Sequence, residues 1–235
     1  KYMAVGILGL TMALGFSGCQ SENQKNQDAY RKIGINSMAE GDYDKAVKSF
    51  QKALDTSLGK IGAEEIDICY YKAAAQFAKK DYDGAIETYT SLIDYDKENA
   101  NAYYLRGSVY LDTDKKDKAF KDYKNAVKYA GREYEIYEGI YENLTNKGET
   151  EEAKNYLKKA LDIKPKDGAD YAEQGHVYYL LEDYTQAKSS LDRAIDKDDK
   201  TALLYLAEVY NATDQQEQGQ ALLESYVKEN AKDSE

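Results

Sequence analysis

The sequence predicts an all-α fold made of about six consecutive pairs of helices. A short segment with a recurring pattern returns along the chain, mostly at intervals of 34 residues. Apolar residues on both sides of each copy recur with the spacing of one helix face. The 235 residues include a single proline, and so few prolines favour long helices over a loop-rich fold.

The recurring segment reads as the turn between two helices. It first appears as GDYDKA from Gly41 to Ala46, and each later copy keeps a small residue at its last position. The last positions are Ala46, Ala85, Ala119, Ala153, Ala187 and, in a faint final copy, Gly219, at spacings of 39, 34, 34, 34 and 32 residues. A period of this length is typical of proteins built from stacked helical repeats.

Each repeat is expected to contain one helix before this turn and one after it. In the first repeat the two helix faces are Tyr30, Ile33, Gly34 and Ser37, and then Ala46, Phe50, Ala53 and Leu54. Gly41 can adopt the left-handed conformation that ends a helix. Asp42 is placed to cap the following helix by accepting from its free N–H groups, and Asp81 and Asp183 occupy the same position in their copies.

The order of residue types within each repeat resembles the tetratricopeptide repeat family. That pattern has an aromatic residue, then a small residue one turn later, then a large apolar residue in the second helix. These positions hold Tyr30, Cys69, Tyr103, Tyr137, Tyr171 and Leu203; then Gly34, Ala73, Gly107, Tyr141, Gly175 and Ala207; then Phe50, Tyr89, Tyr123, Leu157, Leu191 and Leu223. No single position is specific, but the phase persists along the chain, whereas only Pro165 keeps the family's closing proline.

The resemblance implies a right-handed α-solenoid over residues 27–233. Its repeats lie near 27–60, 66–99, 100–133, 134–167, 168–199 and 200–233. Small residues let paired helices approach to about 8–10 Å, and the large apolar residue packs between neighbouring repeats. Because no repeat buries its faces alone, the array is stable only by stacking. The segment 59–65 is expected to lengthen the loop between the first two repeats.

In this family the first helices of successive repeats line a groove that binds a protein or peptide. The matching positions here are Arg31, Ile35, Asp67, Tyr70, Asn101, Tyr104, Glu135, Glu138, Glu142, His176, Tyr179, Glu208 and Asn211. This implied groove is aromatic and acidic. The basic clamp by which some relatives hold acidic chaperone tails is absent, since Asp67 and Tyr70 stand where basic residues are needed. We therefore expect a basic or neutral protein partner; a merely solvated inner surface is the alternative.

The first residues read as an export and anchoring signal. Residues 2–18 carry no charge and are too short for the roughly 20 apolar residues of a membrane-spanning helix. They lead into the sequence FSGC at 16–19, which resembles the bacterial lipobox, with Phe16 where Leu is usual. The resemblance implies a signal peptide at 1–18, lipid on Cys19 and a flexible tether at 19–26. We expect attachment to the extracytoplasmic face of a cell membrane; a signal or short anchor helix without lipid is the alternative.

Charge and motif content argue against several classes of function. The net charge of −11 repels nucleic acid and anionic head groups. His176 is the only histidine, so a Ser-His-Asp triad would have to use it, and a zinc site of two His or four Cys is not possible. The chain has no phosphate-binding glycine motif. Cys69 reads as a small buried hydrophobe. We therefore expect no metal, no cofactor and no enzymatic activity.

These observations favour a lipid-anchored adaptor that holds other envelope proteins. An assembly lipoprotein for pili or outer-membrane proteins is an alternative, and a lipid-anchored hydrolase is a weaker one because the nucleophile–base arrangement is missing. Near the C-terminal end, Leu222, Leu223 and Tyr226 are expected to be exposed, which favours a homodimer formed through the last repeat.

Overall fold

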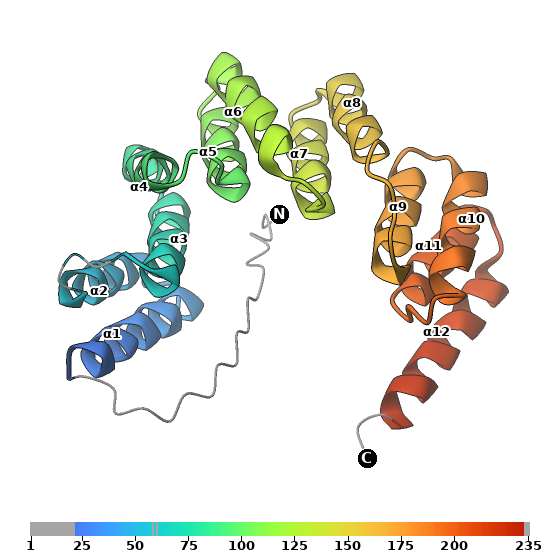
Figure 1. Cartoon of the computed structure of the whole chain (residues 1–235), viewed down its shortest axis with the longest axis horizontal. Coiled ribbons are helices and arrows are strands. Elements are labelled where there is room, and N and C mark those ends of the chain that lie inside the picture. Colours follow the sequence, from blue (N-terminus) through green and yellow to red (C-terminus); the bar gives the residue numbers. More distant parts are fainter. Residues whose placement is uncertain (1–21, 58, 60, 233–235) are drawn as a thin grey trace. The chain divides into compact units, whose positions relative to one another are not determined.

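The structure, a computed structural model, describes residues 22–57, 59 and 61–232. These residues form twelve α-helices and no β-strand, which confirms the predicted all-α fold (Figure 1). The helices divide into two compact parts, an N-terminal part that ends at Tyr129 and a C-terminal part that begins at Ala130.

The helices are joined in pairs by short turns, and each pair is one repeat. The N-terminal part contains α1 Glu22–Ala39, α2 Tyr43–Thr56, α3 Ala63–Ala78, α4 Tyr82–Tyr95, α5 Ala100–Asp112 and α6 Lys116–Tyr129. The C-terminal part contains α7 Tyr134–Asn146, α8 Thr150–Ala160, α9 Gly168–Leu180, α10 Tyr184–Ile195, α11 Ala202–Ala212 and α12 Gln216–Lys232.

The same backbone turn joins the two helices of every repeat. The first residue of each recurring segment has positive φ: Gly41 (77°), Lys80 (66°), Asp114 (56°), Gly148 (82°), Glu182 (65°) and Asp214 (59°). The next N–H donates to a carbonyl five residues earlier, as from Asp42 to Ser37 at 2.8 Å and from Asp183 to Tyr178 at 2.9 Å. This hydrogen bond satisfies a carbonyl that the helix end leaves without an intrahelical donor. The left-handed residue predicted at Gly41 is therefore a property of all six turns.

The predicted aspartate caps are confirmed. Asp42 accepts from the Lys45 N–H at 3.0 Å, and Asp81 accepts from the Gly84 N–H at 3.1 Å. Asp183 caps α10 in the same way. Each carboxylate thus satisfies a free N–H and places negative charge at the positive end of the helix dipole.

Close approach within the repeats depends on the small residues of the first helix. A Cβ built on Gly34 would lie 2.5 Å from the Phe50 ring, and one on Gly107 would lie 2.8 Å from the Tyr123 ring. The large apolar residues also meet the next repeat: Phe50 stacks on Tyr71 of α3, with ring centroids 5.7 Å apart. The predicted packing between neighbouring repeats is confirmed at this contact.

Two helices begin earlier than the sequence indicated. Residues 22–26 were expected in a flexible tether but form the first turns of α1, in which Gln27 is buried and donates to Glu65 at 2.7 Å. The expected loop 59–65 ends sooner, because α3 begins at Ala63 and Glu65 accepts from the Gly62 N–H at 2.8 Å. Both starts lie beside the contact between Gln27 and Glu65, which ties α1 to α3.

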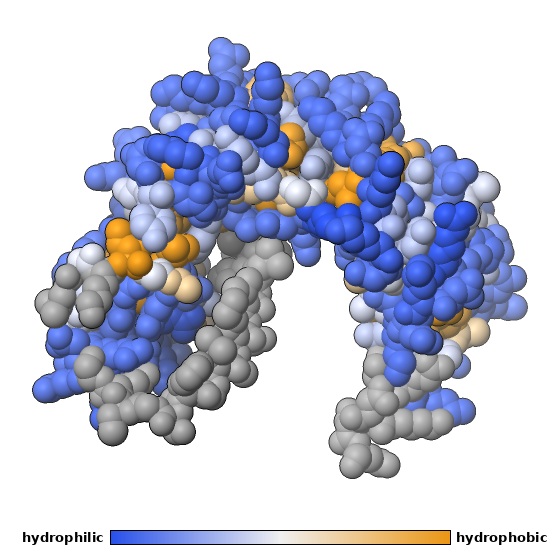
Figure 2. Space-filling view, in the orientation of Figure 1, coloured by the Kyte–Doolittle hydropathy of each residue, from blue (hydrophilic) through white to orange (hydrophobic). Residues whose placement is uncertain are grey.

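The surface is mostly hydrophilic, with small hydrophobic areas on the face shown in Figure 2. Within the described part of the chain, every helix is too short or too polar to span a membrane. The expected signal peptide at 1–18 and the lipidated Cys19 lie outside the described residues. Near the end of α12, Leu223 is 39% exposed and Val227 is 66% exposed, and the homodimer stays a prediction.

Candidate functional site

In the N-terminal part, two of the predicted groove residues, Arg31 and Asp67, pair with each other. Arg31 of α1 donates from Nε to Asp67 of α3 at 2.8 Å, and its guanidinium lies 5.2 Å from the centroid of the Tyr71 ring. Tyr70 donates its hydroxyl to Asn99 at 2.6 Å. The charge of Asp67 is therefore already paired, which leaves this surface less acidic than the sequence indicated.

In the C-terminal part, the predicted residues converge from three helices. The Nδ1 atom of His176 on α9 lies 2.9 Å from Oε1 of Glu138 on α7. The same imidazole stacks on Tyr205 of α11, with ring centroids 4.3 Å apart, and more distantly on Tyr179 at 6.1 Å. We call Glu135, Glu138, Glu173, His176, Tyr179, Tyr205 and Glu208 the acidic cluster.

Within the acidic cluster, Glu138 and Glu173 are half-buried, and the exposed carboxylates of Glu135 and Glu208 add to the negative charge around them. Burial, followed by the charges of Glu138 and Glu135, raises the pKa of Glu173 from its ordinary 4.5 to about 7. Burial and the charges of Glu173, Glu138 and Glu208 also raise the pKa of the Tyr205 hydroxyl. Both shifts have the same cause, an excess of negative charge in a poorly solvated place.

His176 is the one cationic partner within this cluster. Burial lowers its pKa, but the hydrogen bond to Glu138 and the charges of Glu138, Glu173 and Glu208 outweigh burial, so that the pKa is raised above 6.5. The protonated imidazole is thus favoured by its neighbours. One imidazolium does not neutralise all the carboxylates around it, and the cluster attracts a further positive charge.

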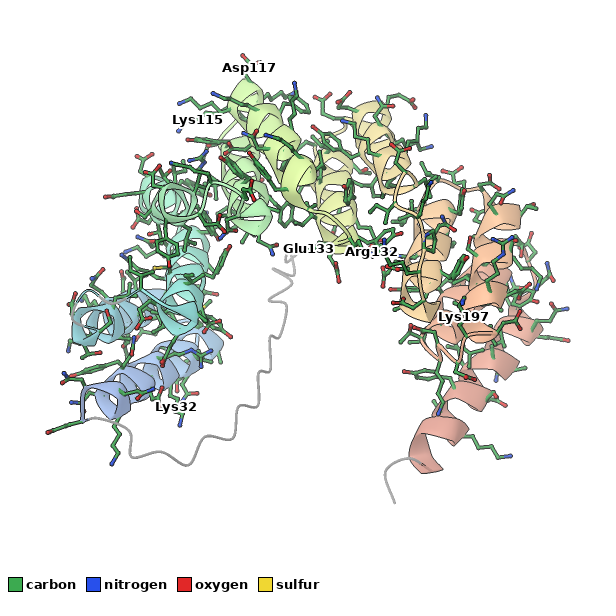
Figure 3. All side chains as sticks on the ribbon, in the orientation of Figure 1. Lys32, Lys115, Asp117, Arg132, Glu133 and Lys197 are labelled. Carbon is green, nitrogen blue, oxygen red and sulfur yellow. The ribbon has the colours of Figure 1, made fainter. Side chains whose placement is uncertain are left out.

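The start of α9 is fixed by a separate ion pair. Arg132, which lies just before α7 (Figure 3), pairs with Asp170 in the first turn of α9 and donates to the Lys164 carbonyl at 2.8 Å. Asp170 also accepts from the Lys166 N–H at 2.8 Å. These contacts hold the N-terminal end of α9 beside the start of α7. They thereby help to place Glu173 and His176 of α9 next to the carboxylates of α7.

The sequence identified part of this cluster and missed part. Glu135, Glu138, His176, Tyr179 and Glu208 were predicted. Two other predicted residues, Glu142 and Asn211, are exposed and form no hydrogen bond or ring contact with His176, and their place in a groove stays a prediction. Glu173 and Tyr205 were not predicted. Each lies three residues before a predicted position, Glu173 before His176 and Tyr205 before Glu208, and residues three apart share a helix face. That spacing is the signal that would have found them.

Comparison with known families agrees with the geometry. A family model described as tetratricopeptide repeat matches residues 28–57, 100–132 and 142–167, and a second with the same description matches residues 173–234. A third, described as TPR repeat, matches residues 73–114, and together the matches cover more than half of the chain. The chain belongs to the tetratricopeptide repeat family.

Two curated relatives share the repeats but are much longer. Anaphase-promoting complex subunit 3 of Schizosaccharomyces pombe is 21% identical over 217 residues, which is 80% of this chain and 33% of the relative. Human tetratricopeptide repeat protein 13 is 27% identical over 154 residues, 60% of this chain and 17% of the relative. This tetratricopeptide repeat chain therefore spans a third or less of the curated relatives it matches.

Two solved structures are similar to this chain over most of its length. The structure of Pseudomonas aeruginosa pilF is 16% identical, with a TM-score of 0.48, and the match covers 86% of this chain and 90% of that one. A tetratricopeptide repeat protein from Parabacteroides merdae is 14% identical, with a TM-score of 0.49, and the match covers 87% and 80% of the two chains.

Besides its charge, the acidic cluster of this tetratricopeptide repeat array contains oxygen and nitrogen atoms that can bind a cation. One carboxylate oxygen each from Glu138 and Glu173 and one ring nitrogen of His176 all lie within 4.8 Å of one another. Such a group can accept hydrogen bonds from a lysine or arginine side chain, or it can coordinate a cation.

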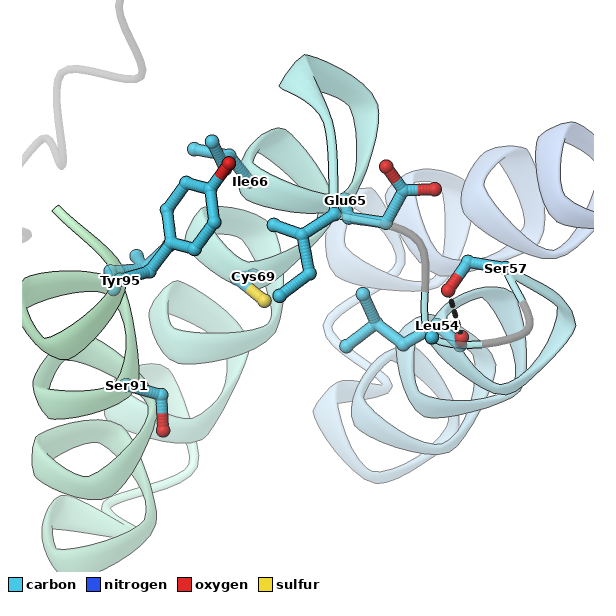
Figure 4. A pocket seen from close by; sticks show the side chains of 10 residues that line it. Leu54, Ser57, Glu65, Ile66, Cys69, Ser91 and Tyr95 are labelled. Carbon is cyan, nitrogen blue, oxygen red and sulfur yellow. Dashed lines mark hydrogen bonds between the residues drawn. The ribbon is translucent and has the colours of Figure 1, made fainter.

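A second feature of the tetratricopeptide repeat array is a small pocket in the N-terminal part. It has a volume of about 200 Å³ and is bordered by α2, the following loop, α3 and α4. Figure 4 shows the Cys69 sulfur between Leu54 and Tyr95. Cys69 is half-buried, and burial raises the pKa of its thiol, which agrees with the predicted role as a small hydrophobe rather than a nucleophile.

Proposed function

We propose that this tetratricopeptide repeat protein is a lipid-anchored extracytoplasmic adaptor that binds a basic segment of a partner protein. One observation carries the proposal: carboxylates from α7, α9 and α11 converge around a single imidazole. Family membership supports a protein partner, because arrays of this kind present extended surfaces made by successive repeats.

The chemistry of the acidic cluster fits lysine or arginine. Glu138 and Glu173 supply acceptors for charge-assisted hydrogen bonds, which are shorter and about twice as strong as neutral ones. Tyr179 and Tyr205 supply flat aromatic surface beside these carboxylates, and a cation gains further when it lies over such a ring. An acidic partner would add like charge to a region that already raises the pKa of Glu173.

The partner chemistry is tested with peptides. Fluorescence anisotropy of a lysine- and arginine-rich peptide should report binding that weakens as salt is added, whereas a glutamate-rich peptide should not bind. The double variant Glu138→Gln with Glu173→Gln should weaken the basic peptide by about tenfold or more, about 1.4 kcal/mol. The matched control is Glu151→Gln with Glu152→Gln, which removes two exposed carboxylates of α8.

Equal weakening by the two double variants would mean that net charge, not this cluster, attracts the peptide. In-cell crosslinking followed by mass spectrometry would then name the natural partner. A list of pilins or outer-membrane barrel proteins would replace the adaptor role with the assembly role.

The anchoring half of the proposal rests on the sequence FSGC at 16–19. Two or three acyl chains on one cysteine would anchor the chain stably, since each buried CH₂ contributes about 0.8 kcal/mol. Cys19→Ser should abolish acyl labelling and shift the protein from the membrane to the soluble fraction, while Cys69→Ser should change neither. Unaltered membrane attachment of the Cys19→Ser protein would contradict the lipid anchor.

A further inference from the structure

The acidic cluster contains a mixed set of donors that no sequence motif predicted. We expected no metal because the chain has one histidine and no cysteine framework. Folding brings Glu138 from the fourth repeat together with Glu173 and His176 from the fifth, residues that lie up to 38 positions apart. The donors thus come from two helices, as in metal sites that are assembled by folding and not by a local loop.

One of the three distances between the ligand atoms matches the spacing around a bound transition metal. Metal–ligand bonds of about 2.0–2.1 Å place neighbouring ligand atoms about 2.9–3.4 Å apart. Oε1 of Glu138 and Nδ1 of His176 are already 2.9 Å apart. The oxygen of Glu173 lies within 4.8 Å of both, so this side chain would have to move closer to complete one coordination sphere.

The surroundings orient the donors and leave a path from solvent. The stacked Tyr205 ring, 4.3 Å from the imidazole centroid, restricts how the His176 ring can turn. The side chains of His176 and Glu138 keep 19% and 18% of their exposure, so an ion can reach them. Glu138 is hydrogen-bonded to His176, and three more carboxylates lie nearby. These belong to Glu135, Glu173 and Glu208, and their charges add to the attraction for a divalent cation.

We propose that Glu138, Glu173 and His176 bind one divalent transition-metal ion, with zinc as the best fit, and so tie α7 to α9. The donor chemistry selects the ion. Imidazole suits zinc, copper, iron and nickel, and carboxylate completes a mixed nitrogen–oxygen set. Magnesium is disfavoured because it prefers oxygen ligands and keeps several waters. This proposal does not rest on peptide binding, and a lysine side chain would compete with the ion for the same carboxylates.

The test is a zinc titration of the full chain by calorimetry near pH 7, without peptide. One ion should bind per chain, and zinc should raise the thermal unfolding midpoint. His176→Ala and the isosteric Glu173→Gln should each weaken zinc binding by more than about tenfold, since even changes outside the ligand set cost that much. Glu142→Gln, which alters an exposed carboxylate one turn further along α7, should leave zinc binding unchanged.

The absorption spectrum of bound Co²⁺ distinguishes this site from binding at the Cys69 thiolate. Co²⁺ added to the full chain should show ligand-field absorption without a thiolate charge-transfer band, and Cys69→Ser should leave the spectrum unchanged. Circular dichroism of Glu173→Gln checks that the variant still folds. The proposal is overturned if the wild-type chain binds no zinc, or if His176→Ala and Glu173→Gln bind it as tightly as Glu142→Gln. Zinc binding without any basic-peptide binding would leave the metal site standing and contradict the adaptor surface.

Discussion

His176 Nδ1 lies 2.9 Å from Glu138 Oε1, so that an imidazole of the fifth repeat is hydrogen-bonded to a carboxylate of the fourth. The two residues are on the first helices of consecutive repeats, and Arg132, just before α7, pairs with Asp170 in the first turn of α9. Two polar links therefore fix α9 against α7, which is where the donors of the acidic cluster must stay aligned to bind a cation.

The first prediction concerns the coupling of this pair. Glu138→Ala and His176→Ala each remove one partner of the hydrogen bond, and a double-mutant cycle of urea unfolding with a chelator present should give a coupling free energy of about 1 kcal/mol. The cycle of Glu142→Ala with His176→Ala is the control, because exposed Glu142 forms no hydrogen bond with the imidazole. Equal coupling in the two cycles would mean that the hydrogen bond adds nothing to stability.

The second prediction concerns a buried ion pair in the N-terminal part. Arg106 of α5 donates to both carboxylate oxygens of Asp122 on α6, at 2.7 and 2.9 Å, and to Thr90 of α4 at 2.9 Å. The Asp122 side chain is only 4% exposed. Asp122→Ala should lower the unfolding free energy by about 3–5 kcal/mol, because it leaves the guanidinium without its counter-charge.

Asp117→Ala is the matched control for that change. Asp117 lies near the start of the same helix and is exposed (Figure 3), so its loss should alter stability by about 0.5 kcal/mol or less. Denaturant unfolding of both variants measures the difference. If Asp122→Ala were no worse than Asp117→Ala, the ion pair between α5 and α6 would have no structural role.

The third prediction concerns the turn between paired helices. Lys80 has φ of 66° and Gly148 has φ of 82°, and the left-handed region costs an L-residue about 1–2 kcal/mol. Lys80→Gly should therefore stabilise the protein by about 0.5–1 kcal/mol, since glycine's flexibility in the unfolded chain offsets part of the relief. Gly148→Ala should destabilise it by about 1 kcal/mol or more.

Lys147→Gly is the control for the added backbone flexibility that any glycine brings. Lys147 adjoins Gly148 but has φ of −94°, so a glycine there adds flexibility without relieving strain and should destabilise. Thermal unfolding of the three variants gives the comparison. A stabilising Lys147→Gly, or a destabilising Lys80→Gly, would contradict the account of the turn.

These turns also illustrate what the sequence could predict. The recurring segment is a local pattern, so it placed all six turns and the caps at Asp42, Asp81 and Asp183 correctly. It indicated a left-handed residue only at Gly41, because lysine and glutamate, which occupy the same position in other turns, rarely adopt positive φ. In the fold, the hydrogen bond across the helix end outweighs that preference at Lys80 and Glu182.

The candidate site was predicted less completely because it depends on side chains from separate repeats. The family positions identify one stripe of each helix, which is why Glu173 and Tyr205 on the neighbouring stripe were missed. Pairing is equally invisible in the sequence: nothing local to Asp67 indicates that Arg31, 36 residues earlier, neutralises it. The early start of α1 has the same origin, because Gln27 is held by Glu65 of the next repeat.

The last prediction follows from the carboxylates that α1 and α3 bring together. Burial, followed by the hydrogen bond with Asp28, raises the pKa of Glu64 from 4.5 to about 7, and the charge of Glu65 adds to the effect while Arg31 opposes it. Between these two values the folded chain holds a proton that the unfolded chain releases. The stabilising contribution of Glu64 is thus complete below pH 4.5 and is lost as the pH rises towards about 7.

Glu64→Gln should remove this part of the pH dependence, because the amide keeps a donor for Asp28 and cannot ionise. The unfolding free energy of the variant, relative to wild type, should therefore increase as the pH rises from 4.5 to about 7 and then level off. Urea unfolding at a series of pH values measures it, with exposed Glu40→Gln as the control. A difference between Glu64→Gln and wild type that stays constant with pH would show that Glu64 ionises normally in the folded chain.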